Sequence, residues 1–85
     1  MNGLELRRKR AIYRANHRGT KELDIVLGRF AMACVRTMDE ERLTAFEQLL
    51  VLPDPDIDYW IRGAKPSEGV AAAVAEVRVF LGLKD

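Results

Sequence analysis

The sequence predicts an all-α protein, a small five-helix bundle that forms a single domain over residues 1–85. Three observations predict this class. Apolar residues recur with helical spacing in every substantial segment, and no segment alternates in the manner of a strand. A chain of 85 residues suffices for one domain with a modest core. Its hydrophobic content of 48% is too high for a disordered chain, and no apolar run approaches the ~20 residues that span a bilayer.

The first helix is expected over roughly residues 4–16, and the second begins near Thr20. The first has only a thin apolar stripe and is expected to pack on one side, through Leu4, Ala11, Ile12 and Ala15. The second has the i, i+3, i+4, i+7 pattern of a central core helix, through Leu23, Val26, Leu27, Phe30, Ala31 and Cys34. Cys34 is therefore expected to be a small buried thiol.

The third helix is expected to begin near residues 37–39, where a side-chain oxygen can cap its free N–H groups. Glu40 and Glu41 then favour the positive end of the helix dipole. The predicted buried face consists of Leu43, Phe46, Leu49 and Leu50.

The fourth helix has the clearest start, with Asp54 as the predicted cap and Pro55 in the first turn, where its missing N–H costs nothing. Gly63 and Pro66 end this helix, and Ser67 is the predicted cap of the fifth. The residues expected to face inward from these two helices are Ile57, Trp60, Ile61, Val70, Ala73, Val74, Val77, Phe80 and Leu81.

Charge is distributed unevenly, although the formal net charge is only +1. Residues 1–22 hold seven Lys or Arg and two acids, whereas residues 39–58 hold seven acids and one Arg. Arg7 to Arg10 with Tyr13 could form a nucleic-acid patch, but an acidic segment packed nearby would repel phosphate. A solvated face or a docking surface for an acidic protein is favoured, and no nucleic-acid partner is expected.

The residue inventory argues against catalysis by this chain alone. Cys34 is the only cysteine and His17 the only histidine, so neither an internal disulfide nor a protein-built metal site is expected. The sequence has no recognisable nucleophile motif and no Gly-rich phosphate loop. His17 is interpreted as a surface residue at a helix end rather than a proton shuttle. The N-terminal segment is interpreted as a folded helix rather than a signal or transit peptide, which favours a cytoplasmic protein without membrane insertion.

The break between the first two helices carries the most informative residues, Arg18-Gly19-x-x-Glu22. Arg18 offers a planar fork of donors, Gly19 tolerates positive φ and close backbone approach, and Glu22 lies in the first turn of the next helix. Such a corner can bind another molecule. An alternative stays open: Gly19 is the left-handed residue that ends the first helix, and Arg18 pairs with Glu22 across the turn.

This corner belongs to a longer series of short motifs in a fixed order. After Arg18-Gly19-x-x-Glu22-Leu23-Asp24 come Gly28-Arg29-Phe30, Phe46-Glu47-Gln48-Leu49-Leu50, Pro53-Asp54-Pro55-Asp56, Trp60-Ile61, Gly63 and Pro66. The series resembles the succinate dehydrogenase assembly-factor family, small helical proteins called SdhE in bacteria, over nearly the whole chain. Thr20 departs from the family pattern, in which a larger apolar residue such as Met is common.

The resemblance implies a chaperone-like assembly factor, not an enzyme, that binds the flavoprotein subunit of succinate dehydrogenase, and also that of fumarate reductase. It implies that the chain promotes covalent attachment of FAD, which belongs to the client, and binds no cofactor itself. On this reading Arg18 makes a bidentate contact to the client, and Gly19 permits close approach. Glu22 engages a client donor or orients Arg18, and Lys21 and Asp24 lie at the rim of the contact.

Two other functions are compatible with the residues alone. One is a small protein-interaction module unrelated to flavin, of the kind found in antitoxins, and the other is a nucleic-acid-binding helical module. The free chain is expected to be a monomer, although apolar residues expected to be exposed, such as Ile25 and Val79, leave a dimer open.

Overall fold

The computed structural model describes residues 3–83, and this part of the chain forms five α-helices and two short 3₁₀ helices, with no strand. The α-helices are α1 (Gly3–Ala15), α2 (Lys21–Cys34), α3 (Glu40–Leu50), α4 (Asp54–Ile61) and α5 (Ala71–Phe80). The 3₁₀ helices are η1 (Val35–Thr37) after α2 and η2 (Glu68–Val70) before α5. The predicted all-α class and its five helices are confirmed. None of the helices within residues 3–83 is long and apolar enough to cross a bilayer.

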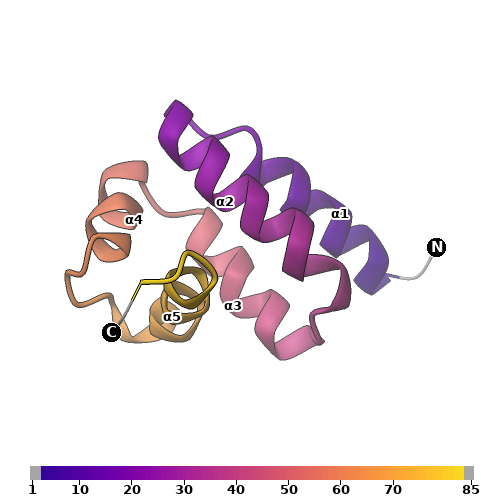
Figure 1. Cartoon of the computed structure of the whole chain (residues 1–85). Coiled ribbons are helices and arrows are strands. Elements are labelled where there is room, and N and C mark those ends of the chain that lie inside the picture. Colours follow the sequence, from indigo (N-terminus) through magenta and orange to yellow (C-terminus); the bar gives the residue numbers. More distant parts are fainter. Residues whose placement is uncertain (1–2, 84–85) are drawn as a thin grey trace.

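The helices are arranged as a hairpin packed on a three-helix unit (Figure 1). α1 and α2 lie side by side and run in opposite directions, and η1 leads from α2 into α3. α3 contacts both α1 and α5, so it joins the two halves of the molecule. α4 and α5 pack together, and α5 also contacts both α3 and α2 (Figure 1). The turn between α1 and α2 lies beside the start of α4.

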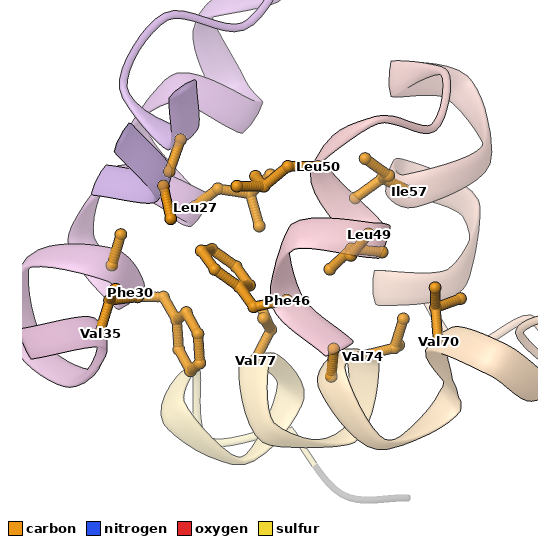
Figure 2. Packing of buried hydrophobic residues seen from close by; sticks show 14 of the residues in the cluster. Leu27, Phe30, Val35, Phe46, Leu49, Leu50, Ile57, Val70, Val74 and Val77 are labelled. Carbon is orange, nitrogen blue, oxygen red and sulfur yellow. The ribbon is translucent and has the colours of Figure 1, made fainter. Parts of the chain in front are cut away.

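Phe30 of α2 and Phe46 of α3 lie at the centre of the core, with ring centroids 5.2 Å apart (Figure 2). Apolar side chains from all five helices surround these rings, and no polar or charged residue is buried among residues 3–83. Val35 of η1 and Met38 just after it are buried without having been predicted. The buried residues that helical spacing did predict are Ala11, Ala15, Leu23, Leu27, Phe30, Ala31, Leu43, Phe46, Leu49, Leu50, Ile57, Ile61, Val70, Ala73, Val74 and Val77.

Several residues predicted to face the core are not fully buried. The partly buried ones, which pack against the core, are Leu4, Ile12, Val26, Cys34, Trp60 and Leu81. Phe80, the last residue of α5, is 41% exposed, although its ring packs against that of Phe30. Helical periodicity identifies the inward direction but not where a helix leaves the core.

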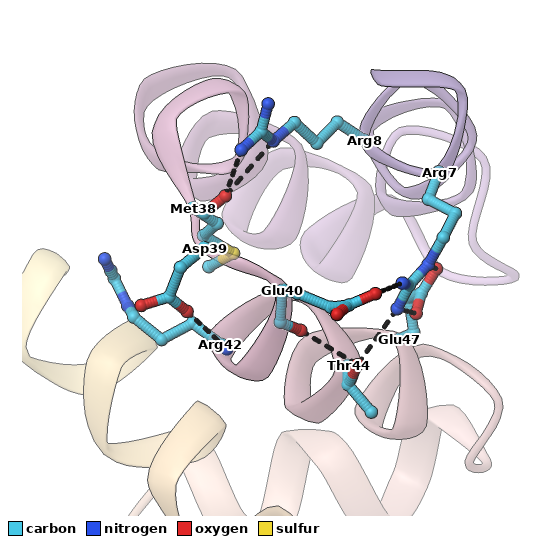
Figure 3. A network of polar contacts seen from close by, with 8 residues as sticks. All are labelled: Arg7, Arg8, Met38, Asp39, Glu40, Arg42, Thr44 and Glu47. Carbon is cyan, nitrogen blue, oxygen red and sulfur yellow. Dashed lines mark hydrogen bonds and ion pairs between the residues drawn. The ribbon is translucent and has the colours of Figure 1, made fainter. Parts of the chain in front are cut away.

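Of the three predicted side-chain caps, one forms and two do not. Asp39 caps α3, and its Oδ1 accepts the backbone N–H of Arg42 at 2.8 Å (Figure 3). Asp54 was expected to cap α4, but this prediction is wrong: Pro53 is the N-cap, and Asp54 is the first helical residue. Ser67 makes no capping hydrogen bond, because the 3₁₀ turn η2 intervenes before α5 begins.

The basic segment of α1 packs against the acidic α3 (Figure 3). Arg7 forms ion pairs with Glu47 at 2.6 Å and Glu40 at 2.9 Å. The hydrogen bond with Glu47 is the main cause that raises the pKa of Arg7 above its ordinary value. Arg8 donates to the carbonyl of Met38, with Nε at 3.1 Å. Part of the predicted basic patch is therefore already engaged by groups of the chain itself, with carboxylates beside it.

Candidate functional site

The turn between α1 and α2 is held in place by contacts to distant parts of the chain. We define the α1–α2 corner as residues 16–24, from the end of α1 through the first turn of α2. Thr20 is the N-cap of α2 and has extended backbone, but its side chain makes no capping hydrogen bond. The conformation of the corner therefore depends on other residues, chiefly on Arg18 and two carboxylates.

Arg18 ties the corner to the end of α3 and the start of α4. Its Nη2 lies 2.6 Å from Asp54 Oδ1, and its Nε donates to the same oxygen at 2.8 Å. Nη2 also donates to the carbonyl of Leu52 at 2.8 Å, and Nη1 donates to the carbonyl of Leu50. The side chains of Arg18 and Asp54 are only 11% and 14% exposed. The guanidinium is thus directed into the molecule. We call the ion pair of Arg18 and Asp54 the Arg18–Asp54 clamp.

The charges of this clamp match the helix ends that it joins. Arg18 binds the carbonyl of Leu50, the last residue of α3, and that of Leu52 just after it, at the helix end where the dipole favours a cation. Asp54 lies in the first turn of α4, where the dipole favours an anion. Because Asp54 is occupied by Arg18, its carboxylate does not serve as the capping group that the local sequence suggested.

Two carboxylates also bind the backbone of the corner. Asp54 Oδ2 accepts the backbone N–H of Gly19 at 2.9 Å, and Asp24 Oδ1 accepts the backbone N–H of Arg18. Asp24 comes from α2 itself and is half-buried, whereas Asp54 comes from α4. Together they satisfy two consecutive N–H groups of the turn, so its path is fixed from both sides.

Gly19 has a steric role that differs from the alternative considered above. Its φ is not positive; in the described chain positive φ occurs only at Gly63 and Gly82. The interpretation of Gly19 as a left-handed helix terminator is therefore wrong. A Cβ on Gly19 would lie 3.0 Å from Asp54 Oδ2, which is tighter than ordinary contact. Glycine is needed here because the carboxylate of Asp54 approaches the backbone closely. An approach by a client's backbone stays a prediction.

The outer surface of the corner is formed by different residues. Gly19, Thr20, Lys21 and Glu22 are exposed. The side chains of Lys21 and Glu22 make no hydrogen bond or ion pair with any residue in the part of the chain that the structure describes. The alternative in which Glu22 pairs with Arg18 is therefore wrong, because Asp54 takes that place. Glu22 instead lines an open depression of about 350 Å³ beside Pro55.

Two features of the corner could not be found by local sequence reasoning. The first is the Arg18–Asp54 clamp, whose members are 36 positions apart. The second is the close approach of α1 to α2: Gly28 lies beside Asn16, and a Cβ on Gly28 would collide with Asn16 Oδ1. The side chain of Asn16 is held by its own hydrogen bond, from Nδ2 to the carbonyl of Ile12 at 2.8 Å.

His17 lies two residues after the end of α1 and takes no part in the clamp. Its ring stacks on Tyr13 with centroids 4.0 Å apart, and Nδ1 lies 2.8 Å from the carbonyl of Tyr13. Both residues are exposed. This position agrees with the interpretation of His17 as a surface residue near a helix end.

The fold and the corner define a class: a small all-helical domain that presents a turn held by an internal ion pair. A family model described as flavinator of succinate dehydrogenase matches residues 9–80. The chain belongs to this family, which confirms the resemblance seen in the sequence.

Individual relatives agree with this assignment. The chain is 46% identical over 65 residues to the FAD assembly factor SdhE of Acetobacter pasteurianus, a match that covers 76% of this chain and 60% of the relative. It is 40% identical over 58 residues to the mitochondrial succinate dehydrogenase assembly factor 2 of Dictyostelium discoideum, a match that covers 68% of this chain and 41% of the relative. The corresponding protein of Drosophila grimshawi is 35% identical over 66 residues, covering 75% and 45%. The chain thus spans 41–60% of the length of these relatives.

Proposed function

We propose that this chain binds the flavoprotein subunit of succinate dehydrogenase and promotes covalent attachment of FAD to it. Family membership supports this proposal, as do the relatives, which are an FAD assembly factor and succinate dehydrogenase assembly factors. The structural observation that carries it is the α1–α2 corner. The corner is fixed from inside by the Arg18–Asp54 clamp, while Lys21 and Glu22 are exposed and unpaired within the described residues. The flavoprotein subunit of fumarate reductase is proposed as a second client.

The roles of the site residues follow from their positions. Glu22 and Lys21 contact the client, because their charges are exposed and are not neutralised by the chain. Gly19 belongs to the same exposed surface. Arg18 was expected to contact the client directly, but its donors are engaged by its own chain, so we assign it a positioning role. Asp24 has the same role through the backbone of Arg18.

The mechanism requires no reacting group from this chain. Covalent attachment through a client histidine would require removal of a proton from the 8α-methyl group of the flavin and groups that stabilise negative charge on the ring. The client must supply the groups that stabilise this charge. A helper that docks beside the FAD site accelerates the reaction by holding the client in its reactive arrangement. A rigid corner suits this task because little conformational freedom is lost on binding.

The test is co-expression of the flavoprotein subunit with this chain in a host that lacks its own assembly factor. Covalent flavin is scored by fluorescence on a denaturing gel. The wild-type chain is expected to raise the covalent flavin content, and Glu22→Gln to reduce that gain with no greater loss of thermal stability than Glu41→Gln, since both remove an acid from a first helical turn. Glu41→Gln is the matched control, because Glu41 is also an exposed acid in the first turn of a helix. An unchanged flavin content with the wild-type chain would contradict the proposed function.

A further inference from the structure

A second surface feature begins at the α1–α2 corner and runs along the outer face of α2. It is an open groove of about 690 Å³ that extends from Lys21 to Phe80 at the end of α5, and we call it the α2–α5 groove. Ile25, Arg29 and Met32 line it between these ends. With Lys21 these residues are spaced three or four positions apart, so they share one face of the helix. The core residues of α2 occupy the other face.

The groove is apolar and exposed. Ile25, Met32 and Phe80 are 45%, 52% and 41% exposed, which is unusual for three large apolar side chains that line one groove. Phe80 is held in place, because its ring packs nearly perpendicular to that of the buried Phe30, with centroids 5.7 Å apart. One wall of the groove is therefore preformed. The opposite side contains Met32, whose flexible side chain can adapt to the shape of an apolar group.

Cations flank the apolar residues. Arg29 lies between Ile25 and Met32 along the helix, and Lys21 lies at the end nearest the corner. Both are exposed, and neither side chain forms an ion pair or hydrogen bond within residues 3–83. A protein segment that fills the groove with apolar side chains binds most favourably if it also places a carboxylate beside Arg29.

This charge pattern argues against a second copy of the chain as the occupant. A two-fold interface joins the same patch on both subunits. The acid in the groove is Asp24, and its Oδ1 already accepts the backbone N–H of Arg18. A second copy would therefore offer Arg29 only a carboxylate that is already bound by its own chain, whereas a different protein can offer a free one. A different protein that offers a carboxylate is the better fit.

We propose that the α2–α5 groove is a second part of the client-binding surface, which seats an apolar segment of the flavoprotein subunit bearing a carboxylate opposite Arg29. This inference rests on the proposed function. Its basis is continuity, because Lys21 and Asp24 belong both to the corner and to the groove. The client thus contacts polar residues at the corner and apolar residues along α2, in the usual pattern of an apolar centre with a polar rim.

The test measures binding of the purified apo flavoprotein subunit to Met32→Glu, Ile25→Glu and Arg29→Glu by titration calorimetry. Each is expected to weaken the affinity by about tenfold or more, since central apolar and Arg contacts dominate interfaces. The matched control is Leu6→Glu, which changes an apolar residue of similar exposure (42%) at the far end of α1 from the corner. It is expected to bind as the wild type does. Thermal midpoints are measured for every variant, and the three variants are read together so that one poorly folded protein does not decide the result.

Wild-type affinity in all three groove variants, with weakened binding by Glu22→Gln, would overturn the inference while the proposed function stands. A wild-type dimer in light scattering that Met32→Glu converts to a monomer would also overturn it, by assigning the groove to a second copy. Failure of the proposed function has a different signature, because the wild-type chain would then neither bind the client nor raise its covalent flavin.

Discussion

Replacing Arg18 by Ala is expected to destabilise this domain strongly, because it removes one member of a mostly buried ion pair. The carboxylate of Asp54 would keep only the N–H of Gly19, and the carbonyls of Leu50 and Leu52 would lose their donor. Removal of one partner from a buried pair costs about 3–5 kcal/mol. Since water reaches both side chains slightly, at 11% and 14% exposure, we expect the lower end of this range, about 3 kcal/mol.

The assay is thermal and urea unfolding followed by helical circular dichroism. For a domain of this size about 3 kcal/mol corresponds to a decrease of about 12–24 °C in the unfolding midpoint. Arg62→Ala is the matched control, since Arg62 forms an i,i+4 pair with Asp58 in which the side chains are 73% and 42% exposed. Such a pair contributes only about 0.5 kcal/mol.

A double-mutant cycle isolates the contact between the two side chains. Arg18→Ala, Asp54→Ala and the double variant should give a coupling energy of about 2 kcal/mol, within the range found for groups in one network. If Arg18→Ala instead costs no more than Arg62→Ala, the clamp contributes nothing measurable and the positioning role of Arg18 is wrong.

Three further predictions concern the packing around the corner and the basic face of α1. Gly19→Ala should lower the free energy of unfolding, measured with urea, by about 1 kcal/mol, because the new Cβ would press on Asp54 Oδ2. An equal decrease in an Asp54→Ala background would refute that cause. Gly28→Ala should raise the free energy of unfolding by up to about 1 kcal/mol, through higher helix propensity, only in a background in which Asn16 has been changed to Ala. The same increase in the wild-type background would show that the new Cβ does not collide with Asn16. Arg7→Ala should lower the thermal midpoint by an amount that shrinks as salt is added, and a loss independent of salt would speak against the ion pairs with α3.

The helices and the core were largely predictable because both depend on spacing within a short segment. The buried faces of α2 and α3 follow from apolar residues at i, i+3, i+4 and i+7, and the cap at Asp39 follows from local chemistry. The prediction failed where a distant group competes. Asp54 has the local pattern of a helix cap, yet its carboxylate is bound by Arg18 and by the backbone of Gly19.

The candidate site was predicted in its location but not in its construction. The motif identified the corner, and Glu22 and Lys21 are exposed there as a binding role requires. The direction of Arg18 could not be predicted, because a guanidinium next to a turn can point outward to a partner or inward to helix ends. The choice depends on carbonyls at Leu50 and Leu52, which become neighbours of Arg18 only after α3 and α4 have packed.

The central claim is that the outward-facing acid of this corner contacts the client, and binding measures it most directly. Purified Glu22→Gln should bind the apo flavoprotein subunit about tenfold or more weakly than the wild-type chain in titration calorimetry, while losing no more thermal stability than Glu41→Gln. Equal affinity of the two proteins would contradict the account.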